Sequence, residues 1–336
     1  MSEIAEKRTP IKRWLVLGLI LLGIYFGFIA GGIFKPTSPA VKLPGEPIWP
    51  GVPITNTLLA TFIADLILIA IALFSVGGFV RSKKDVPAGF YGFFEFLVEF
   101  LWNTTEGAAG KWARRLFPWM ATIFLLVFTA NMVKLVPGFE SIGYLEKAEG
   151  SAKGYAPARL FGNVFALDGT KEVPHAEGEA AGEGGVCASC EVVPFLRGSA
   201  TDLNFTFALA VIAVVMIQVF GVWALGGSYF TKFINTRTMF GGGISGMFGV
   251  IDFGVGLLEL VSEFAKILSF GFRLFGNIFA GALLLAILGA LTVVVVPTGL
   301  YLLEVFVGLI QAYVFAMLAL VFMSQAVVSH HGGEGH

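Results

Sequence analysis

The sequence predicts an all-α, polytopic membrane protein, and three observations support this fold class. Hydrophobic residues make up 56% of the 336 residues, and the mean hydropathy is +0.83. Charged residues make up only 13%, about half the share found in soluble domains. Apolar runs long enough to cross a bilayer recur along the chain. We therefore expect the chain to lie in a lipid bilayer, and its net charge of −1 argues against a nucleic-acid partner.

Six apolar spans follow one another along the chain. They cover residues 14–34, 56–80, 116–136, 203–225, 256–294 and 298–326. The last two are longer than the roughly 20 residues that a perpendicular crossing needs, so we expect long, tilted helices. Pro297, Thr298 and Gly299 lie between these two spans and are expected to form the turn of a helical hairpin.

Basic residues are distributed unevenly over the connecting segments, and this distribution predicts the orientation. Residues 1–13 contain four Lys or Arg and residues 81–115 contain six, whereas residues 35–55 contain only two. Because basic loops stay on the cytoplasmic side, we expect both termini to be cytoplasmic. The first span could instead be a signal peptide, although its length and the absence of a clear small-residue cleavage site before Lys35 favour an uncleaved anchor.

Two segments outside the spans have distinct compositions. Residues 87–105 alternate Phe and Leu with Glu95 and Glu99, which predicts an amphipathic helix on the cytoplasmic surface or a surface for a partner. The segment at 137–200 is predicted to be an outside loop. Its part at 175–185 is rich in Gly, Ala and Glu and is expected to be poorly ordered.

Cys187 and Cys190 lie close together near the end of this loop. An outside location favours a small disulfide between them. One Cys-x-x-Cys arrangement, without a second pair or a redox fold nearby, is weak support for zinc or thiol exchange. The sequence contains no recognisable phosphate-binding loop or nucleophile with a base, so we expect no cofactor, no metal and no covalent chemistry from this chain alone.

Arg273 is the most informative residue for function. It lies in an otherwise nearly charge-free stretch at 267–296 that is long enough to cross a bilayer. A guanidinium keeps its charge at membrane depth and is tolerated there only when it faces protein, water or a counter-charge. Arg273 is therefore expected to be either an ion-pair partner inside a helix bundle or a fixed charge beside an ion path.

Polar residues around Arg273 recur at helical spacing. On a helix with about 100° per residue, six side chains fall within about 80° of one another. These are Glu259, Glu263, Lys266, Phe270, Arg273 and Asn277. The opposite face is apolar, which is typical of a helix with lipid on one side and polar surroundings on the other.

The last span adds Glu304 and Gln311, which are seven residues apart and share one helix face. The predicted orientation puts Glu304 in the outer half of the membrane and Glu259 near the inner end of the preceding helix. This arrangement suits a proton path made of two offset halves, in which the permanent cation of Arg273 blocks direct leakage. A carboxylic acid on a moving partner would then carry the proton past Arg273, because a nearby positive charge favours its ionised form.

Several segments of the chain closely resemble subunit a of the F-type ATP synthase. The most specific is SFGFRLFGNIFAG at residues 269–281. The others are FPWMAT at 117–122 with Ala130-Asn131 and Val136-Pro137-Gly138, ATDLNFT at 200–206, and LIQAYVF at 309–315. The resemblance covers about residues 50–328, and it does not cover the first span or the Cys-bearing part of the outside loop.

The resemblance implies a proton-conducting stator beside a ring of c subunits, joined to peripheral-stalk b subunits and the remainder of the synthase. By matching positions, Arg273 resembles the stator arginine. Asn277, Glu304 and Gln311 resemble groups of the outer half-channel, and Glu259 resembles the acidic group of the inner one. Glu263 belongs to this set by its place on the stripe. The implied location is an energy-coupling membrane, such as the bacterial inner membrane.

Three parts of the chain are expected on this basis. Residues 1–50 comprise a cytoplasmic tail, an extra membrane anchor and a short outside loop. Residues 51–328 form the subunit-a-like membrane domain, with the outside loop at 137–200, and residues 329–336 form a tail with three histidines.

One position departs from the family pattern. Many relatives carry a carboxylate or histidine directly after the Ala-Gly that closes the arginine motif, and Ala282 stands there in this chain. The outer path would then depend on Glu304 and water. Asp65, deep in the second span, could compensate for Ala282, or it could be a carboxylate that is hydrogen-bonded within the bundle.

Two other classes of function stay open at this stage. A self-contained secondary transporter would bind a solute or ion near the midplane, but such folds often show internal repeats, and the 259–311 pattern has no counterpart in the first half of the chain. A purely structural membrane scaffold would leave the polar stripe unexplained.

Overall fold

The computed structural model describes most of the chain. The described residues are Trp14, Leu17, Gly18, Leu21, 44–49, 51–82, 90–136, 138–148, 154–173, 187–233, 244–291 and 295–328. The predicted first span therefore lies almost wholly outside the described residues, as do the stretch at 175–185 and the tail at 329–336.

The chain divides into two compact units, which are described separately. The first, here called the helical unit, comprises Leu43–Glu140, Phe195–Ala280 and Val305–His336. The second, here called the sheet unit, comprises Met1–Lys42, Ser141–Pro194 and Gly281–Glu304.

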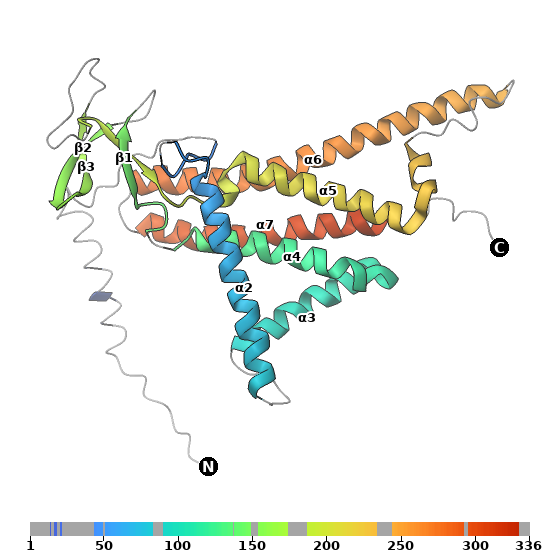
Figure 1. Ribbon diagram of the computed structural model, residues 1–336, viewed down its shortest axis with the longest axis horizontal. Coiled ribbons are helices and arrows are strands. Elements are labelled where there is room, and N and C mark those ends of the chain that lie inside the picture. The colour runs from blue at the N-terminus through green and yellow to red at the C-terminus, as the bar shows by residue number, and fades with distance from the viewer. Residues whose placement is uncertain are drawn as a thin grey trace, which may run out of the picture. The chain divides into compact units, whose positions relative to one another are not determined.

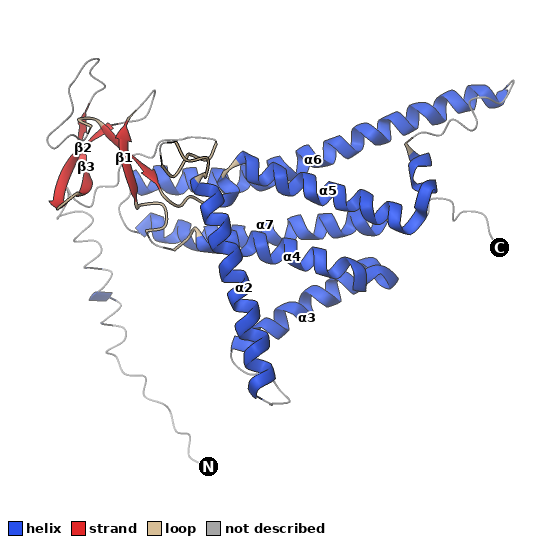
Figure 2. Cartoon of the chain, viewed as in Figure 1, coloured by secondary structure: helices blue, strands red, loops and turns tan. Residues whose placement is uncertain are grey.

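Five of the helices overlap predicted apolar spans, and the sixth, α3, overlaps the segment at 87–105 that was predicted to be an amphipathic helix (Figures 1 and 2). They are α2 at Asn56–Ser82, α3 at Phe90–Ala109, α4 at Ala113–Val133, α5 at Leu203–Leu225, α6 at Ile244–Leu291 and α7 at Val295–Ala326. Among the described residues, five helical stretches are long and apolar enough to cross a membrane, and one of them joins α3 to α4. The all-α membrane fold is thereby confirmed, and the first predicted span, at 14–34, lies almost wholly outside the described residues.

The predicted position of the last hairpin turn is wrong. Helix α7 begins at Val295, so Pro297, Thr298 and Gly299 lie in its first turns. A proline is tolerated there because the first N–H groups of a helix have no partner within the helix. The sequence signal therefore marks the start of α7, and the connection from α6 falls within residues 292–294, outside the described residues.

The core of the helical unit is formed mainly by four helices, to which α3 adds the fully buried Leu101. Fully or almost fully buried side chains come from α4 and α5, which contribute Leu116, Met120, Phe124, Ala213, Ile217 and Phe220, and from α6 and α7, which contribute Phe270, Leu274, Ile278, Phe315, Ala316, Ala319 and Met323. The rings of Phe270 and Phe315 meet at 5.0 Å, edge to face. Small residues on α7 allow close approach of neighbouring helices, which is a common device in membrane bundles.

Polar contacts join the beginnings of α2 and α5. Thr57 Oγ1 donates a hydrogen bond to Asp202 Oδ2 at 2.7 Å. The other oxygen of Asp202 accepts from the backbone N–H of Asn204 at 2.9 Å and so caps α5. Gly45 lies so close to Thr57 that a Cβ there would overlap its hydroxyl. Asp202, in the ATDLNFT segment, thus has a structural role at this helix end.

The sheet unit contains a four-stranded antiparallel sheet that the sequence analysis did not predict (Figure 2). The strands are β1 at Gly143–Lys147, β2 at Gly154–Phe161, β3 at Val164–Val173 and β4 at Cys190–Pro194, in the order β1-β4-β2-β3. Gly162 adopts a φ of +56° in the two-residue connection between β2 and β3. A Gly-Asn pair between short apolar runs is a hairpin signal, so the sequence did contain a local indication of these strands.

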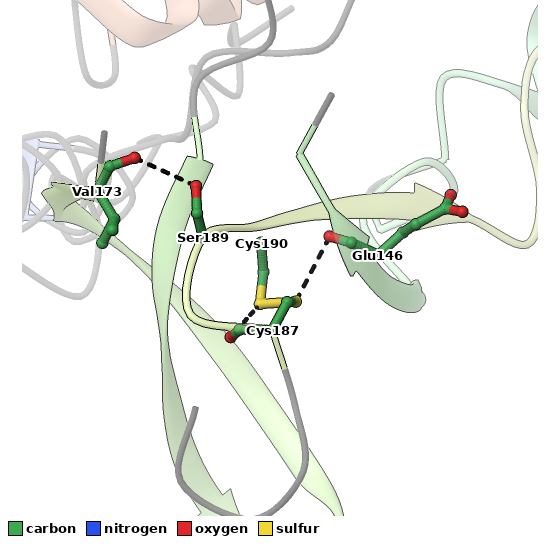
Figure 3. Close-up of a disulfide and its surroundings, with 5 residues drawn as sticks. All are labelled: Glu146, Val173, Cys187, Ser189 and Cys190. Atoms are coloured by element: carbon green, nitrogen blue, oxygen red, sulfur yellow. Dashed lines mark hydrogen bonds between the residues drawn. A yellow bond between two sulfur atoms is a disulfide. The ribbon is translucent and has the colours of Figure 1, made fainter. Parts of the chain in front are cut away.

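A disulfide lies at the point where the strands of this sheet meet (Figure 3). Cys187 and Cys190 are joined, with their Cα atoms 5.5 Å apart. Between them, Ser189 Oγ donates to the carbonyl of Val173, the last residue of β3, at 3.1 Å, and Ser189 O accepts from Ala148 N at the end of β1 at 3.0 Å. The pairing of Tyr155 with Cys190 joins β2 to β4. The disulfide-bonded turn therefore contacts all four strands.

Candidate functional site

Arg273 lies near the middle of the apolar stretch Phe253–Gly289 of α6. Its side chain is exposed, whereas Phe270 and Leu274 on either side of it are buried. The guanidinium Nη2 donates to Ser269 Oγ, one turn earlier, at 3.5 Å. Among the described residues, no carboxylate lies within ion-pair distance of Arg273. A buried ion pair within the bundle, one of the two roles considered for this residue, is therefore absent from the described part of the chain.

Asn277, one turn after Arg273, joins α6 to α7. Its Nδ2 donates to Gln311 Oε1 at 2.8 Å. Gln311 is only 3% exposed, and its Nε2 is buried without a hydrogen-bond partner among the described residues. A buried donor of this kind costs free energy unless water or another group satisfies it. The pair therefore leaves one buried donor that is not satisfied by any described residue, one turn from Arg273.

Asn131 on α4 is a further polar residue that contacts α7, and from the sequence it was expected only to be part of the family resemblance. Its Nδ2 donates to the carbonyl of Gly308 at 3.3 Å, and its Oδ1 is buried without a hydrogen-bond partner in the described part of the chain. Gly308 and Gln311 are three residues apart on α7, so they lie on neighbouring positions of one face. The signal available in the sequence was an amide side chain within an apolar span.

Glu304 lies in the sheet unit and is only 5% exposed. Its carboxylate lies against Gly281, the residue that ends the SFGFRLFGNIFAG motif, and a Cβ at Gly281 would overlap it. A glycine is therefore required at this position to make room for Glu304. Ala282, which lacks the carboxylate or imidazole of many relatives, directly follows the glycine that the Glu304 carboxylate contacts.

Glu259 and Glu263 belong to a cluster of charges on the helical unit. Lys232 Nζ lies 3.4 Å from Glu259 Oε1 and 3.1 Å from Glu263 Oε1, and Lys266 Nζ lies 2.9 Å from Glu263 Oε1. The two carboxylates differ in exposure: the side chain of Glu263 is 8% exposed and that of Glu259 is 41% exposed. The structure therefore brings three members of the predicted stripe together and adds Lys232, which the sequence analysis did not select.

Two other expectations concern Asp65 and metal binding. Asp65 lies in α2 and makes no hydrogen bond or ion pair with any described residue, so the hydrogen bond considered for it within the bundle is not present there. Within the described residues, no group of three or more His, Cys, Asp or Glu side chains could hold a metal ion.

The arrangement thus combines an exposed guanidinium, a hydrogen-bonded amide pair and a cluster of ion pairs along α6. A comparison with known protein families finds a match to the family described as ATP synthase A chain over residues 58–324, which is most of the chain. The matched range includes all of α3, α4, α5 and α6 and nearly all of α2 and α7, together with the whole of the arginine motif. The chain therefore belongs to the ATP synthase A chain family, that of subunit a in the membrane Fo sector of F-type ATP synthases, and is a multi-pass membrane protein of ATP synthesis and proton transport.

Proposed function

We propose that this chain is the stator that guides protons to and from a ring of c subunits through two offset half-channels, with Arg273 between them. Protons enter one half-channel, neutralise a carboxylate on the ring, and leave through the other half-channel after the ring has turned. Flow down the gradient would in this way drive rotation and ATP synthesis.

The exposure of Arg273 is the observation that carries this proposal. A guanidinium near the middle of an apolar span requires protein, water or a counter-charge, and no described carboxylate pairs with it. A ring carboxylate that passes α6 would supply the missing anion. The fixed cation would favour the ionised form of that carboxylate and repel hydronium, so that protons cross only on the ring.

The polar residues near Arg273 would serve the two half-channels. Asn277 and Gln311 form a hydrogen-bonded pair with a spare buried donor, and they would hold water in the outer half-channel. Glu259, with its exposed carboxylate, would exchange protons with the cytoplasm in the inner half-channel. Because Ala282 provides no titratable group, Glu304 would act in the outer path with water.

Partners and orientation follow from the same proposal. The c-subunit ring would lie against the exposed face of α6, and peripheral-stalk b subunits would hold this chain against rotation. Residues 1–50 would add a membrane anchor with a cytoplasmic N-terminus. The disulfide between Cys187 and Cys190 supports an oxidising, non-cytoplasmic location for the sheet, which agrees with the distribution of basic residues. We propose a bacterial inner membrane as the location.

The test is proton flux in vesicles that carry this chain with or without a c-subunit ring, together with ATP-driven proton pumping by the complete synthase. We expect flux to require the ring, and we expect Arg273→Ala to abolish pumping while the chain still assembles. Retained pumping by Arg273→Ala would contradict the proposal. Proton or solute transport by the chain without a ring would instead favour a self-contained transporter.

A further inference from the structure

The short helix η3 at Gly226–Lys232 follows the end of α5 and contacts both α5 and α6. Here residues 226–233 are called the η3 bracket. Tyr229 of this bracket is 2% exposed and packs on Gly221 of α5 so closely that a Cβ at Gly221 would overlap its ring. The carbonyl of Phe233 approaches Gly256 of α6 in the same way. The η3 bracket can therefore pack this closely against α5 and α6 only because Gly221 and Gly256 have no side chain.

A chain of polar contacts runs through the bracket to one carboxylate of α6. Tyr229 donates from its hydroxyl to Gln218 Oε1 at 2.7 Å, and Gln218 Nε2 donates to Glu263 Oε2 at 2.8 Å. The other oxygen, Glu263 Oε1, accepts from Lys232 at 3.1 Å and from Lys266 at 2.9 Å. Both oxygens of Glu263 are therefore engaged by donors from α5, the bracket and α6 itself.

The charges of this cluster balance. Two ammonium groups, Lys232 and Lys266, face two carboxylates, Glu259 and Glu263, so the cluster is neutral when all four are ionised. The ammonium groups also lie over aromatic rings: Lys232 is 4.6 Å from the ring centroid of Tyr229, and Lys266 is 4.9 Å from that of Phe322 on α7. Balanced charges, with several partners for Glu263 and for both ammonium groups, suit a fixed contact within an apolar span.

We infer that Glu263 is a positioning residue that fixes the rotation of α6, and that it does not carry protons. Arg273 is ten residues further along α6, a rise of about 15 Å on a stiff helix. If contacts at Glu263 prevent α6 from rotating about its axis, the direction of every side chain on the helix is fixed, including that of Arg273. The η3 bracket, which supplies Lys232 to Glu263, would therefore determine where the guanidinium points. Glu259, which has one longer contact and a more exposed side chain, is left as the carboxylate that exchanges protons.

This inference rests on the proposed role of Arg273, and the experiment keeps the two apart. In the complete synthase in membrane vesicles, ATP-driven proton pumping and its pH profile are measured for Lys232→Ala, Glu263→Ala, the double variant and Lys232→Arg. A misplacement of about 1 Å at a reacting centre can cost about 100-fold, so we expect each Ala variant to lower pumping by roughly tenfold or more. The double variant should be no worse than either single one, and Lys232→Arg should retain most of the activity.

The pH profile separates positioning from proton transfer. Glu263→Gln should leave the shape of the profile unchanged, whereas Glu259→Gln should alter it. Tyr229→Phe removes one hydroxyl and should lower pumping less than Glu263→Ala does. This milder variant still tests the polar contacts if the Ala variants fail to assemble. Thr231→Ala is the control, because Thr231 is exposed and its hydroxyl bonds to Ser228 O within the bracket.

A changed pH profile for Glu263→Gln, or additive losses in the double variant, would overturn the inference. Arg273→Ala serves as the reference. If Arg273→Ala still pumps, the proposed function fails. If Arg273→Ala is inactive and the Lys232 and Glu263 variants pump like the control, only the positioning role fails.

Discussion

The side-chain amide of Asn277 donates a hydrogen bond to the side-chain oxygen of Gln311 over 2.8 Å, and the two residues are 34 positions apart in the sequence. The bond joins α6 to α7 one turn from Arg273. Because Gln311 is buried and its Nε2 has no partner among the described residues, the pair is incomplete without a further group. Water in the proposed outer half-channel would complete it.

The Asn277–Gln311 pair is expected to act as a unit. We expect Asn277→Leu and Gln311→Leu each to slow ATP-driven proton pumping, because each leaves a polar group unpaired. The double variant should pump roughly fivefold faster than the product of the two single losses predicts, which corresponds to an interaction energy of about 1 kcal/mol. Pumping rates of the four proteins give this interaction energy. Ile310→Leu, on an exposed position of α7, is the control. Independent effects would show that the hydrogen bond has no part in proton transport.

The contact between Gly281 and Glu304 predicts a rescue. In Gly281→Ala, the new methyl group would overlap the Glu304 carboxylate, so we expect a loss of pumping of roughly tenfold. Glu304→Asp withdraws the carboxylate by one methylene, and Gly281→Ala combined with Glu304→Asp should pump faster than Gly281→Ala alone. Gly289→Ala is the matched control, because nothing lies within 4 Å of a Cβ built at that α6 position. Equal rates for Gly281→Ala and Gly289→Ala would refute this account.

Removal of the titratable group at Glu304 tests the outer half-channel. We expect Glu304→Gln to slow proton flow, because the amide keeps the shape of the side chain and cannot exchange a proton. The measurement is passive proton flow through the Fo sector as a function of the pH on the outer side. Flow that matches the unaltered protein over a wide pH range would remove Glu304 from the path.

A lysine is not expected to replace Arg273. The lysine ammonium is a compact charge that loses its proton readily when it is desolvated, whereas a guanidinium stays charged. Arg273→Lys should therefore pump poorly and leak protons as the pH rises. Leakage is measured as proton flow that persists when the ring carboxylates are chemically blocked. If Arg273→Lys pumps as many protons per ATP hydrolysed as the unaltered protein, any positive charge at this position is sufficient for coupling.

The disulfide is expected to stabilise the sheet. A loop of four residues closed by a disulfide is worth about 2 kcal/mol by chain entropy. We expect the Cys187→Ser, Cys190→Ser double variant to speed amide hydrogen exchange in β4 and in the neighbouring β2, since Tyr155 pairs with Cys190. Ala188→Ser, within the same turn, is the control that keeps the disulfide. Unchanged exchange would mean that strand pairing and the contacts of Ser189 hold the turn without it.

Most of the helical fold could be predicted from the sequence, because apolar spans of sufficient length have few alternatives in a bilayer. The spans at 56–80 and 203–225 match α2 and α5 to within two residues. The error at Pro297 arose because a proline signals both a turn and the first turn of a helix. The sheet at 143–194 was missed because strands joined across a long insertion carry only weak local signals.

The candidate site was predictable only in part. The helical period placed Glu259, Glu263 and Lys266 on one stripe, and the structure brings them together. The partners that distinguish the two carboxylates, Gln218 and Lys232, are 45 and 31 residues from Glu263, and helical spacing on α6 contains no information about them. Asn131 entered the sequence analysis only as part of the family resemblance, because its contact with Gly308, 177 residues away, depends on how α4 and α7 pack.

By itself, the sequence determined that the chain is a membrane protein and that a permanent positive charge, Arg273, lies within an apolar span. Both follow from local quantities, namely the transfer free energy of side chains and the 3.6-residue period of a helix. Only the tertiary structure decided that Arg273 is exposed, that Gln311 binds Asn277 and that Glu263 is held by two lysines. The reason is that such contacts depend on how distant segments pack, which no local pattern specifies.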